Sequence, residues 1–232
     1  MRKNPENETD DKMIATIESV YDSFLNVSTQ IEEGDEKVVR GIYNAYEATS
    51  YFFLERLFQV FPFAENDHMI DFGCGKGRVL FMASQYACKH ITGYEINEKR
   101  FSILEQNIRQ YREKHKTASV FDVYNESAQS AAIDDSANKF FFFEPFHLSI
   151  YAKVLKNIKD SLKRRQRDIS IILYLPQDST MNYIDTIPGF HKEIYVDTKL
   201  YYQKNMLLTM PYYAFYCNYS MEDIVDPFFL LY

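Results

Sequence analysis

Several features that the sequence lacks exclude particular classes of protein. It has no tryptophan and only three cysteines, Cys74, Cys88 and Cys217, which are odd in number and widely spaced. They fit neither a disulfide framework nor a metal-binding knuckle, so we treat them as reduced small hydrophobic residues. No apolar run approaches the ~20 residues that cross a bilayer. The polar start does not resemble a secretory signal peptide, and we expect a cytoplasmic protein that does not bind membranes.

An excess of basic residues is also lacking. The 232-residue chain has a formal net charge of −7, which argues against strong sequence-independent binding of nucleic acid. The 46% hydrophobic and 25% charged residues are ordinary for a globular protein. With 19 Phe and 19 Tyr, the core is expected to be built from aromatic rings. The length fits one domain, residues 1–232, with N-terminal helices over 1–66 and an α/β core over 67–232.

Short apolar runs alternate with amphipathic stretches from residue 68 onward, which is typical of a parallel sheet covered by helices. The expected strands are 68–72, 90–95, 119–124, 139–143 and 169–175. Two helices precede them, one carrying Ile14 to Leu25 and one that ends at Pro62. Two later β-rich runs, 190–196 and 211–219, predict an antiparallel pair. The predicted fold is a three-layer α/β sheet, mostly parallel, with this pair at one edge.

A glycine-rich turn follows the first expected strand. The strand ends in the run Asp71-Phe72-Gly73-Cys74-Gly75-Lys76-Gly77, and Arg78 opens a helix. Alternating glycines let the backbone bend tightly and leave its N–H groups uncovered, so that a ligand can approach a helix N-terminus. A dinucleotide fingerprint, G-x-G-x-x-G, would place its third small residue at position 78, where this chain has Arg78.

The arrangement D-x-G-x-G-x-G resembles motif I of the class I S-adenosylmethionine-dependent methyltransferases, and the resemblance extends from about residue 46 to about residue 146. It implies a seven-stranded, Rossmann-like fold and S-adenosylmethionine as cofactor, with the turn under its methionine and ribose parts. In that family the acid at the end of strand one, here Asp71, organises the site around the amino group. The cofactor-binding residues implied in the turn are Asp71, Gly73, Gly75, Lys76, Gly77 and Arg78.

The second expected strand ends in a carboxylate, Glu95, 24 positions after Asp71 (71 to 95). This spacing is close to the ~20 residues expected for an acid that binds ribose. Its carboxylate can accept hydrogen bonds from both ribose hydroxyls, and it would repel a 2′-phosphate. We therefore predict that Glu95, with Ile96 beside it, binds the ribose.

Two other segments match the methyltransferases less sharply. After the third strand, Asn125-Glu126-Ser127-Ala128 stands where the family places polar groups at the adenine edge, although the commoner Asp-Ala pair is absent. Before the first strand, Tyr46-Glu47-Ala48-Thr49-Ser50-Tyr51 either closes over the methionine moiety or simply caps the second helix at Thr49 or Ser50. The candidate cofactor contacts here are Tyr46, Thr49, Asn125, Glu126 and Ser127.

The fourth expected strand, four consecutive phenylalanines, ends in Glu144-Pro145-Phe146. This run resembles motif IV, the (D/N/S)-P-P-(Y/F) loop of amino methyltransferases, with Glu144 as its first residue and only one proline. In that loop a polar residue and a backbone carbonyl hold the target nitrogen while the ring stacks on a planar acceptor. The resemblance implies that Glu144 orients or deprotonates an N–H or O–H acceptor, and that Phe146 packs on it. His147 either assists or is a helix-start residue.

Two other functions are weighed against a methyltransferase. The first is a nicotinamide-dependent oxidoreductase, which the misplaced third glycine argues against. The second is a non-catalytic module that binds S-adenosylmethionine, because fold alone does not prove activity. The sequence predicts no metal site and leaves open the oligomeric state and the methyl acceptor, which is a small molecule, a protein or RNA. The basic stripe from Lys153 to Arg167 is interpreted as a solvated helix face rather than a contact for RNA or an acidic protein.

Overall fold

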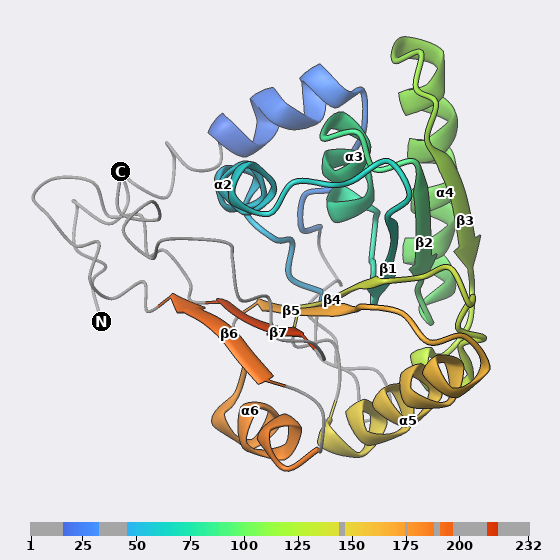
Figure 1. Ribbon diagram of the computed structural model, residues 1–232. Helices are drawn as coiled ribbons and strands as arrows, with labels where there is room; N and C mark the ends of the chain where they lie inside the picture. Colours follow the sequence, from blue (N-terminus) through green and yellow to red (C-terminus); the bar gives the residue numbers. More distant parts are fainter. Residues whose placement is uncertain are drawn as a thin grey trace, which may run out of the picture.

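The structure, a computed structural model, describes residues 16–32, 46–143, 147–174, 176–187, 191–196 and 213–217. A central sheet carries helices on both faces (Figure 1). The helices are α2 (Tyr51–Val60), α3 (Arg78–Gln85), α4 (Glu98–Lys114), the short 3₁₀ helix η1 (Ala128–Ser130), α5 (Leu148–Arg164) and α6 (Asp178–Asp185). Residues 16–25 are also helical and form the blue helix beside α2 and α3 in Figure 1.

The sheet has the strand order β3-β2-β1-β4-β5-β7-β6. Its strands are β1 (His68–Phe72), β2 (His90–Tyr94), β3 (Val120–Tyr124), β4 (Lys139–Phe143), β5 (Ser170–Tyr174), β6 (His191–Val196) and β7 (Tyr213–Cys217). The first five are parallel, and this confirms the predicted parallel sheet covered by helices. Strand β7 pairs antiparallel with β5 and with β6. The strand order reverses beside β1, and ligands of open α/β sheets bind at such a switch point, outside the carboxyl ends of the strands.

Two apolar cores lie on opposite faces of the sheet. On one face, residues of α2, α3 and α4 pack together, and on the other, residues of α5, α6 and η1 do so. The second core holds a row of rings at the carboxyl ends of four adjacent strands. Phe72 of β1 stacks on Phe142 of β4 (centroids 4.9 Å apart) and on Tyr94 of β2 (5.8 Å), and Tyr94 stacks on Tyr124 of β3 (5.2 Å). Each such pair adds about 0.5–1.5 kcal/mol beyond burial, so the row stabilises the pairing of these four strands near their carboxyl ends.

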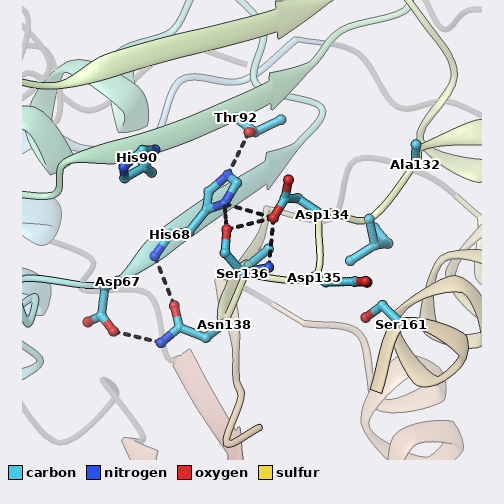
Figure 2. A network of polar contacts seen from close by, with 12 residues as sticks. Asp67, His68, His90, Thr92, Ala132, Asp134, Asp135, Ser136, Asn138 and Ser161 are labelled. Atoms are coloured by element: carbon cyan, nitrogen blue, oxygen red, sulfur yellow. Dashed lines mark hydrogen bonds and ion pairs between the residues drawn. The ribbon is translucent and has the colours of Figure 1, made fainter. Parts of the chain in front are cut away.

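A network of hydrogen bonds surrounds His68 at the amino end of β1 (Figure 2). The His68 ring lies between two hydroxyls, with Nδ1 2.8 Å from Ser136 Oγ and Nε2 2.8 Å from Thr92 Oγ1. The backbone N–H of His68 donates to Asn138 Oδ1 at 2.9 Å, and Asn138 Nδ2 donates to Asp67 at 2.7 Å. This network ties the loop before β4 to β1. Among the described helices, none is long and apolar enough to cross a membrane.

Candidate functional site

The glycine turn bends through three left-handed residues directly after β1. Gly73, Gly75 and Gly77 have φ angles of 85°, 55° and 95°, a region that L side chains rarely adopt. The backbone N–H of Gly73 donates to the Tyr94 carbonyl of β2 at 2.8 Å. A Cβ on Gly77 would lie 2.5 Å from Leu104 Cδ1, so α4 packs directly on the turn. The turn requires glycine both for its backbone shape and for this close packing.

Glu95 follows β2, and its carboxylate faces the turn. Its Oε2 accepts a hydrogen bond from the Gly75 N–H at 3.0 Å, and its Oε1 accepts one from the Asn97 N–H at 2.7 Å. The Arg100 guanidinium lies 3.9 Å from Oε1. Burial raises the pKa of Glu95 in spite of these partners. The structure therefore brings Glu95 and the turn together, as a shared ligand site requires.

Asp71 is the second buried acid at this turn. It is only 3% exposed, and its Oδ2 atom has no hydrogen-bond partner among the described residues. Burial raises its pKa well above the ordinary value, and the neighbouring charge of Glu95 raises it further. A buried carboxylate oxygen without a donor is costly. Two buried acids at one turn, one of them with an oxygen that lacks a donor among the described residues, favour a positively charged or hydrogen-bond-donating ligand.

Tyr46 covers the outer face of the turn. A Cβ built on Gly75 would lie 2.3 Å from Tyr46 Cε2, so the ring lies directly against this glycine. The ring is flanked by Lys76 Nζ and Arg100 Cζ, each 5.3 Å from its centroid. The Tyr46 hydroxyl donates to the Thr29 carbonyl at 2.7 Å. Of the two alternatives for residues 46–51, this contact supports a segment that closes over the turn.

The capping alternative receives less support. Ser50 occupies the N-cap position of α2, but its side chain makes no capping hydrogen bond. Thr49 is buried, and its carbonyl accepts a hydrogen bond from Arg78 Nη1 at 3.0 Å. The backbone of this segment therefore contacts the residue that ends the turn.

The side chains of Lys76 and Arg78 point to the N-terminal segment, which we define as residues 16–32 and 46–50. Lys76 is fully buried, and its Nζ donates to the Gln30 carbonyl at 2.6 Å. Arg78 Nε donates to Thr29 Oγ1 at 2.8 Å, and Nη1 forms an ion pair with Glu18. Both were predicted to bind the cofactor. This stays a prediction; in the described structure their charged groups join the turn to the preceding chain.

Sequence reasoning did not identify Asn107, which also holds this junction. Asn107 lies on α4 and is 1% exposed. Its Nδ2 donates to the carbonyls of Lys76 and Ser28, each at 2.9 Å, and its Oδ1 accepts from the Ser28 N–H at 2.9 Å. The available signal was a polar residue among the apolar positions Leu104, Ile108 and Tyr111, which share one face of this helix.

The residues predicted at the ribose and adenine lie around the end of β3. Asn125 Nδ2 donates to the Glu95 carbonyl at 2.8 Å, so it fixes the loop that carries the acid. Ser127 caps η1 through its side chain, and Glu126 is exposed. Ile96 is partly buried and packs against the core beneath α5.

The predicted acceptor segment is only partly described. Glu144 and Phe146 lie outside the described residues. Strand β4 ends at Phe143, one residue beyond Phe142, which pairs with the last residue of β1. His147 is the N-cap of α5, and its Nδ1 accepts a hydrogen bond from the Ser149 N–H at 3.3 Å. His147 is therefore a helix-start residue, which is one of the two interpretations given for it.

The basic stripe on α5 engages nearby partners. Lys156 and Lys163 both pair with Asp160, at 2.6 and 2.7 Å, and Arg164 pairs with Asp135 at 2.7 Å. These contacts agree with the interpretation of a solvated helix face. In the described ranges no group of three or more His, Cys, Asp or Glu side chains could hold a metal ion.

Comparison with solved structures identifies the class of this fold. An RNA methyltransferase from Salinibacter ruber in complex with S-adenosyl-L-homocysteine matches 78% of this chain and 100% of its own, with 14% identity and a TM-score of 0.51. Precorrin-6y C5,15-methyltransferase from Geobacter metallireducens matches 81% and 95%, with 16% identity and a TM-score of 0.50. Precorrin 8w decarboxylase from Methanobacterium thermoautotrophicum matches 81% and 98%, with 17% identity and a TM-score of 0.51.

The chain therefore has the Rossmann-like fold of the class I S-adenosylmethionine-dependent methyltransferases. At 14–17% identity the similarity establishes the fold and not the activity. No protein-family model and no curated protein sequence matches the chain.

Proposed function

We propose that this protein is an S-adenosylmethionine-dependent methyltransferase that methylates an N or O acceptor held near residues 144–146. The observation that carries the proposal is the unpartnered Oδ2 of Asp71, buried beside Glu95 at a turn of left-handed glycines. S-adenosylmethionine carries an ammonium group and a sulfonium group, and this positive charge suits two buried acids. A donated hydrogen bond from the ammonium group would satisfy the oxygen atom.

The same charges argue against a nicotinamide dinucleotide. Its pyrophosphate is anionic and needs free backbone N–H groups at a helix N-terminus. Here the Gly75 N–H is engaged by the Glu95 carboxylate, and the Asp71 carboxylate lies buried nearby. Arg78 occupies the position of the third small residue, and its guanidinium faces Thr29 rather than the turn. The site therefore favours a cation over a diphosphate.

Each residue near the turn has a proposed part in cofactor binding. The methionine and ribose parts lie at the turn, where Asp71 accepts from the ammonium group and Glu95 accepts from the ribose hydroxyls. Tyr46 forms a wall over the turn. The polar residues 125–127 contribute the adenine edge, and Ile96 lies beside Glu95 at the ribose. The bound cofactor supplies an activated methyl group. We also propose that residues 1–232 are one domain with the seven-stranded sheet of this class, including its antiparallel pair.

The acceptor segment is proposed to be residues 144–146. Methyl transfer depends mainly on holding the acceptor lone pair in line with the methyl group. Glu144 would orient an N–H or O–H acceptor and take its proton where one must leave, and Phe146 would pack on it. Support comes from β4, which ends beside the end of β1 and its glycine turn. His147 is omitted from this role because its ring caps α5.

The test begins with binding. Calorimetric titration with S-adenosylhomocysteine, S-adenosylmethionine and NAD should show binding of the first two and weaker or no binding of NAD. Incubation with methyl-labelled S-adenosylmethionine and separate RNA, protein and small-molecule fractions then identifies the acceptor class. RNA is the first fraction to test, because the Salinibacter ruber neighbour is an RNA methyltransferase. Tighter binding of NAD than of S-adenosylhomocysteine would refute the proposal.

A further inference from the structure

The N-terminal segment depends in part on polar contacts for its attachment. In residues 16–32, Leu25 is fully buried, whereas Val20, Phe24 and Ile31 are 62%, 55% and 52% exposed. Leu25, Tyr21 and Val27 pack against the core, so apolar contacts supply one part of the attachment and polar contacts the other. Segments with few buried apolar contacts open more readily than the core.

Buried polar side chains contribute to the attachment. Tyr51 of α2 donates to Asp22, and three others come from the turn or from the helix packed on it. Lys76 reaches the Gln30 carbonyl, Arg78 reaches Thr29 and Thr49, and Asn107 bridges to the backbone of residue 28. Their side chains are almost completely excluded from solvent. Buried hydrogen bonds to charged groups contribute more than neutral ones, so Lys76 and Arg78 make a substantial contribution to holding the segment.

The docked segment completes the wall of the site. The Tyr46 hydroxyl is bonded to the Thr29 carbonyl, and its ring lies against Gly75. Arg78 donates to the hydroxyl of the same Thr29, so one residue links the wall and the turn. Asp22 accepts hydrogen bonds from both the N–H (2.8 Å) and the hydroxyl (2.6 Å) of Thr29. Thr29 is thereby held in one position, and Tyr46 with it.

We propose that Lys76, Arg78 and Asn107 are positioning residues that set the affinity for the cofactor by holding the N-terminal segment, with Tyr46 as its wall, on the glycine turn. The inference rests on the proposed function. Docking of the segment and binding of the cofactor then form one coupled equilibrium. The apparent Kd equals the intrinsic Kd divided by the docked fraction, so variants that undock the segment weaken binding without touching the ligand.

The experiment uses full-length protein and S-adenosylhomocysteine as the probe. Calorimetry gives the Kd, and hydrogen exchange measures the opening of residues 16–32 and 46–50. The variants are Arg78→Met and Asn107→Leu. Leucine suits position 107 because the neighbouring positions of that face are apolar, so this variant guards against misfolding. The matched control is Lys89→Met, which removes an exposed ion pair with Glu65 just before β2.

We expect Arg78→Met to raise the Kd about tenfold, which corresponds to about 1.4 kcal/mol. Asn107→Leu should raise it by a smaller factor. Exchange in the segment should accelerate in both variants and slow again at saturating ligand, while Lys89→Met keeps wild-type values. Faster exchange with an unchanged Kd would overturn the inference, because the side chains would then serve the fold alone. Failure of the wild-type protein to bind S-adenosylhomocysteine would instead refute the proposed function.

Discussion

Replacing Asp71 with asparagine tests the charge that the proposed function depends on. The substitution keeps the shape of the side chain and removes the buried negative charge. In the described structure the Oδ2 atom has no donor, and burial together with Glu95 raises the pKa of Asp71. We therefore expect Asp71→Asn to stabilise the ligand-free protein at neutral pH and to weaken cofactor binding. Opposite effects on stability and binding are the signature of a group kept for its ligand.

The gain in stability follows from the unpaired oxygen. An unsatisfied buried polar group costs about 1–3 kcal/mol, and more when it is charged. The amide retains some of this cost, so a net gain of about 1 kcal/mol is expected, which raises the Tm by about 2–4 °C in a chain of this size. Because the folded pKa of Asp71 is raised, the folded state binds more protons than the unfolded state above the ordinary pKa of 3.8. Wild-type stability therefore falls as pH rises from that value, and the advantage of the variant grows with it.

The loss of binding follows from one charged hydrogen bond. Such a bond contributes about 1.5–3 kcal/mol, so the Kd for S-adenosylhomocysteine should rise about ten- to a hundredfold. Thermal unfolding at several pH values and calorimetry in the same buffers measure both effects. Asp122→Asn, at an exposed acid of β3, is the control and should change neither. A variant that is less stable than wild type at neutral pH and binds the ligand equally well would refute the reasoning.

The other predictions concern the acceptor segment, the turn and the far end of β1. Glu144→Gln should lower the methyl-transfer rate while the Kd for S-adenosylhomocysteine, measured by calorimetry, stays constant; an unchanged rate on every accepted substrate would contradict its role. Gly75→Ala should weaken that binding, since its Cβ would lie 2.3 Å from Tyr46 and the φ angle of 55° disfavours alanine; a Kd equal to that of the wild type would contradict the role of the turn. Burial lowers the pKa of His68 below 6.5, so wild-type stability should fall as pH drops below that value, and thermal unfolding of His68→Gln should show a flatter profile.

Local patterning was sufficient to predict the parallel part of the sheet. The expected strands 90–95 and 119–124 differ from β2 and β3 by one residue at one end. Both strands are short runs rich in apolar residues, and polar residues follow each of them, which marks where they end. The proximity of Asp71 and Glu95 was predictable for a related reason. Both follow adjacent parallel strands, whose carboxyl ends meet at one edge of the sheet.

The direction of the side chains between the glycines was harder to predict. A motif marks the turn as a ligand site, and this led us to assign Lys76 and Arg78 to the cofactor. The side chains of these two residues bond to Gln30 and Thr29, which lie more than 40 positions earlier in a stretch with no strand periodicity. No local sequence pattern specifies contacts between residues so far apart, because they depend on where the tertiary fold places residues 29 and 30.

The contacts of Arg78 show why the third small residue of the dinucleotide pattern G-x-G-x-x-G is absent at position 78. In a dinucleotide site the third small residue allows the helix to pack closely on the strand. In this chain the small residue comes one position earlier, at Gly77, where a Cβ would meet Leu104 and Phe81. Position 78 is thereby free to carry a long side chain, and it carries one whose charge is buried against Glu18 and Thr29. The shift of one residue thus keeps the close packing at Gly77 and lets the residue after it bind the N-terminal segment.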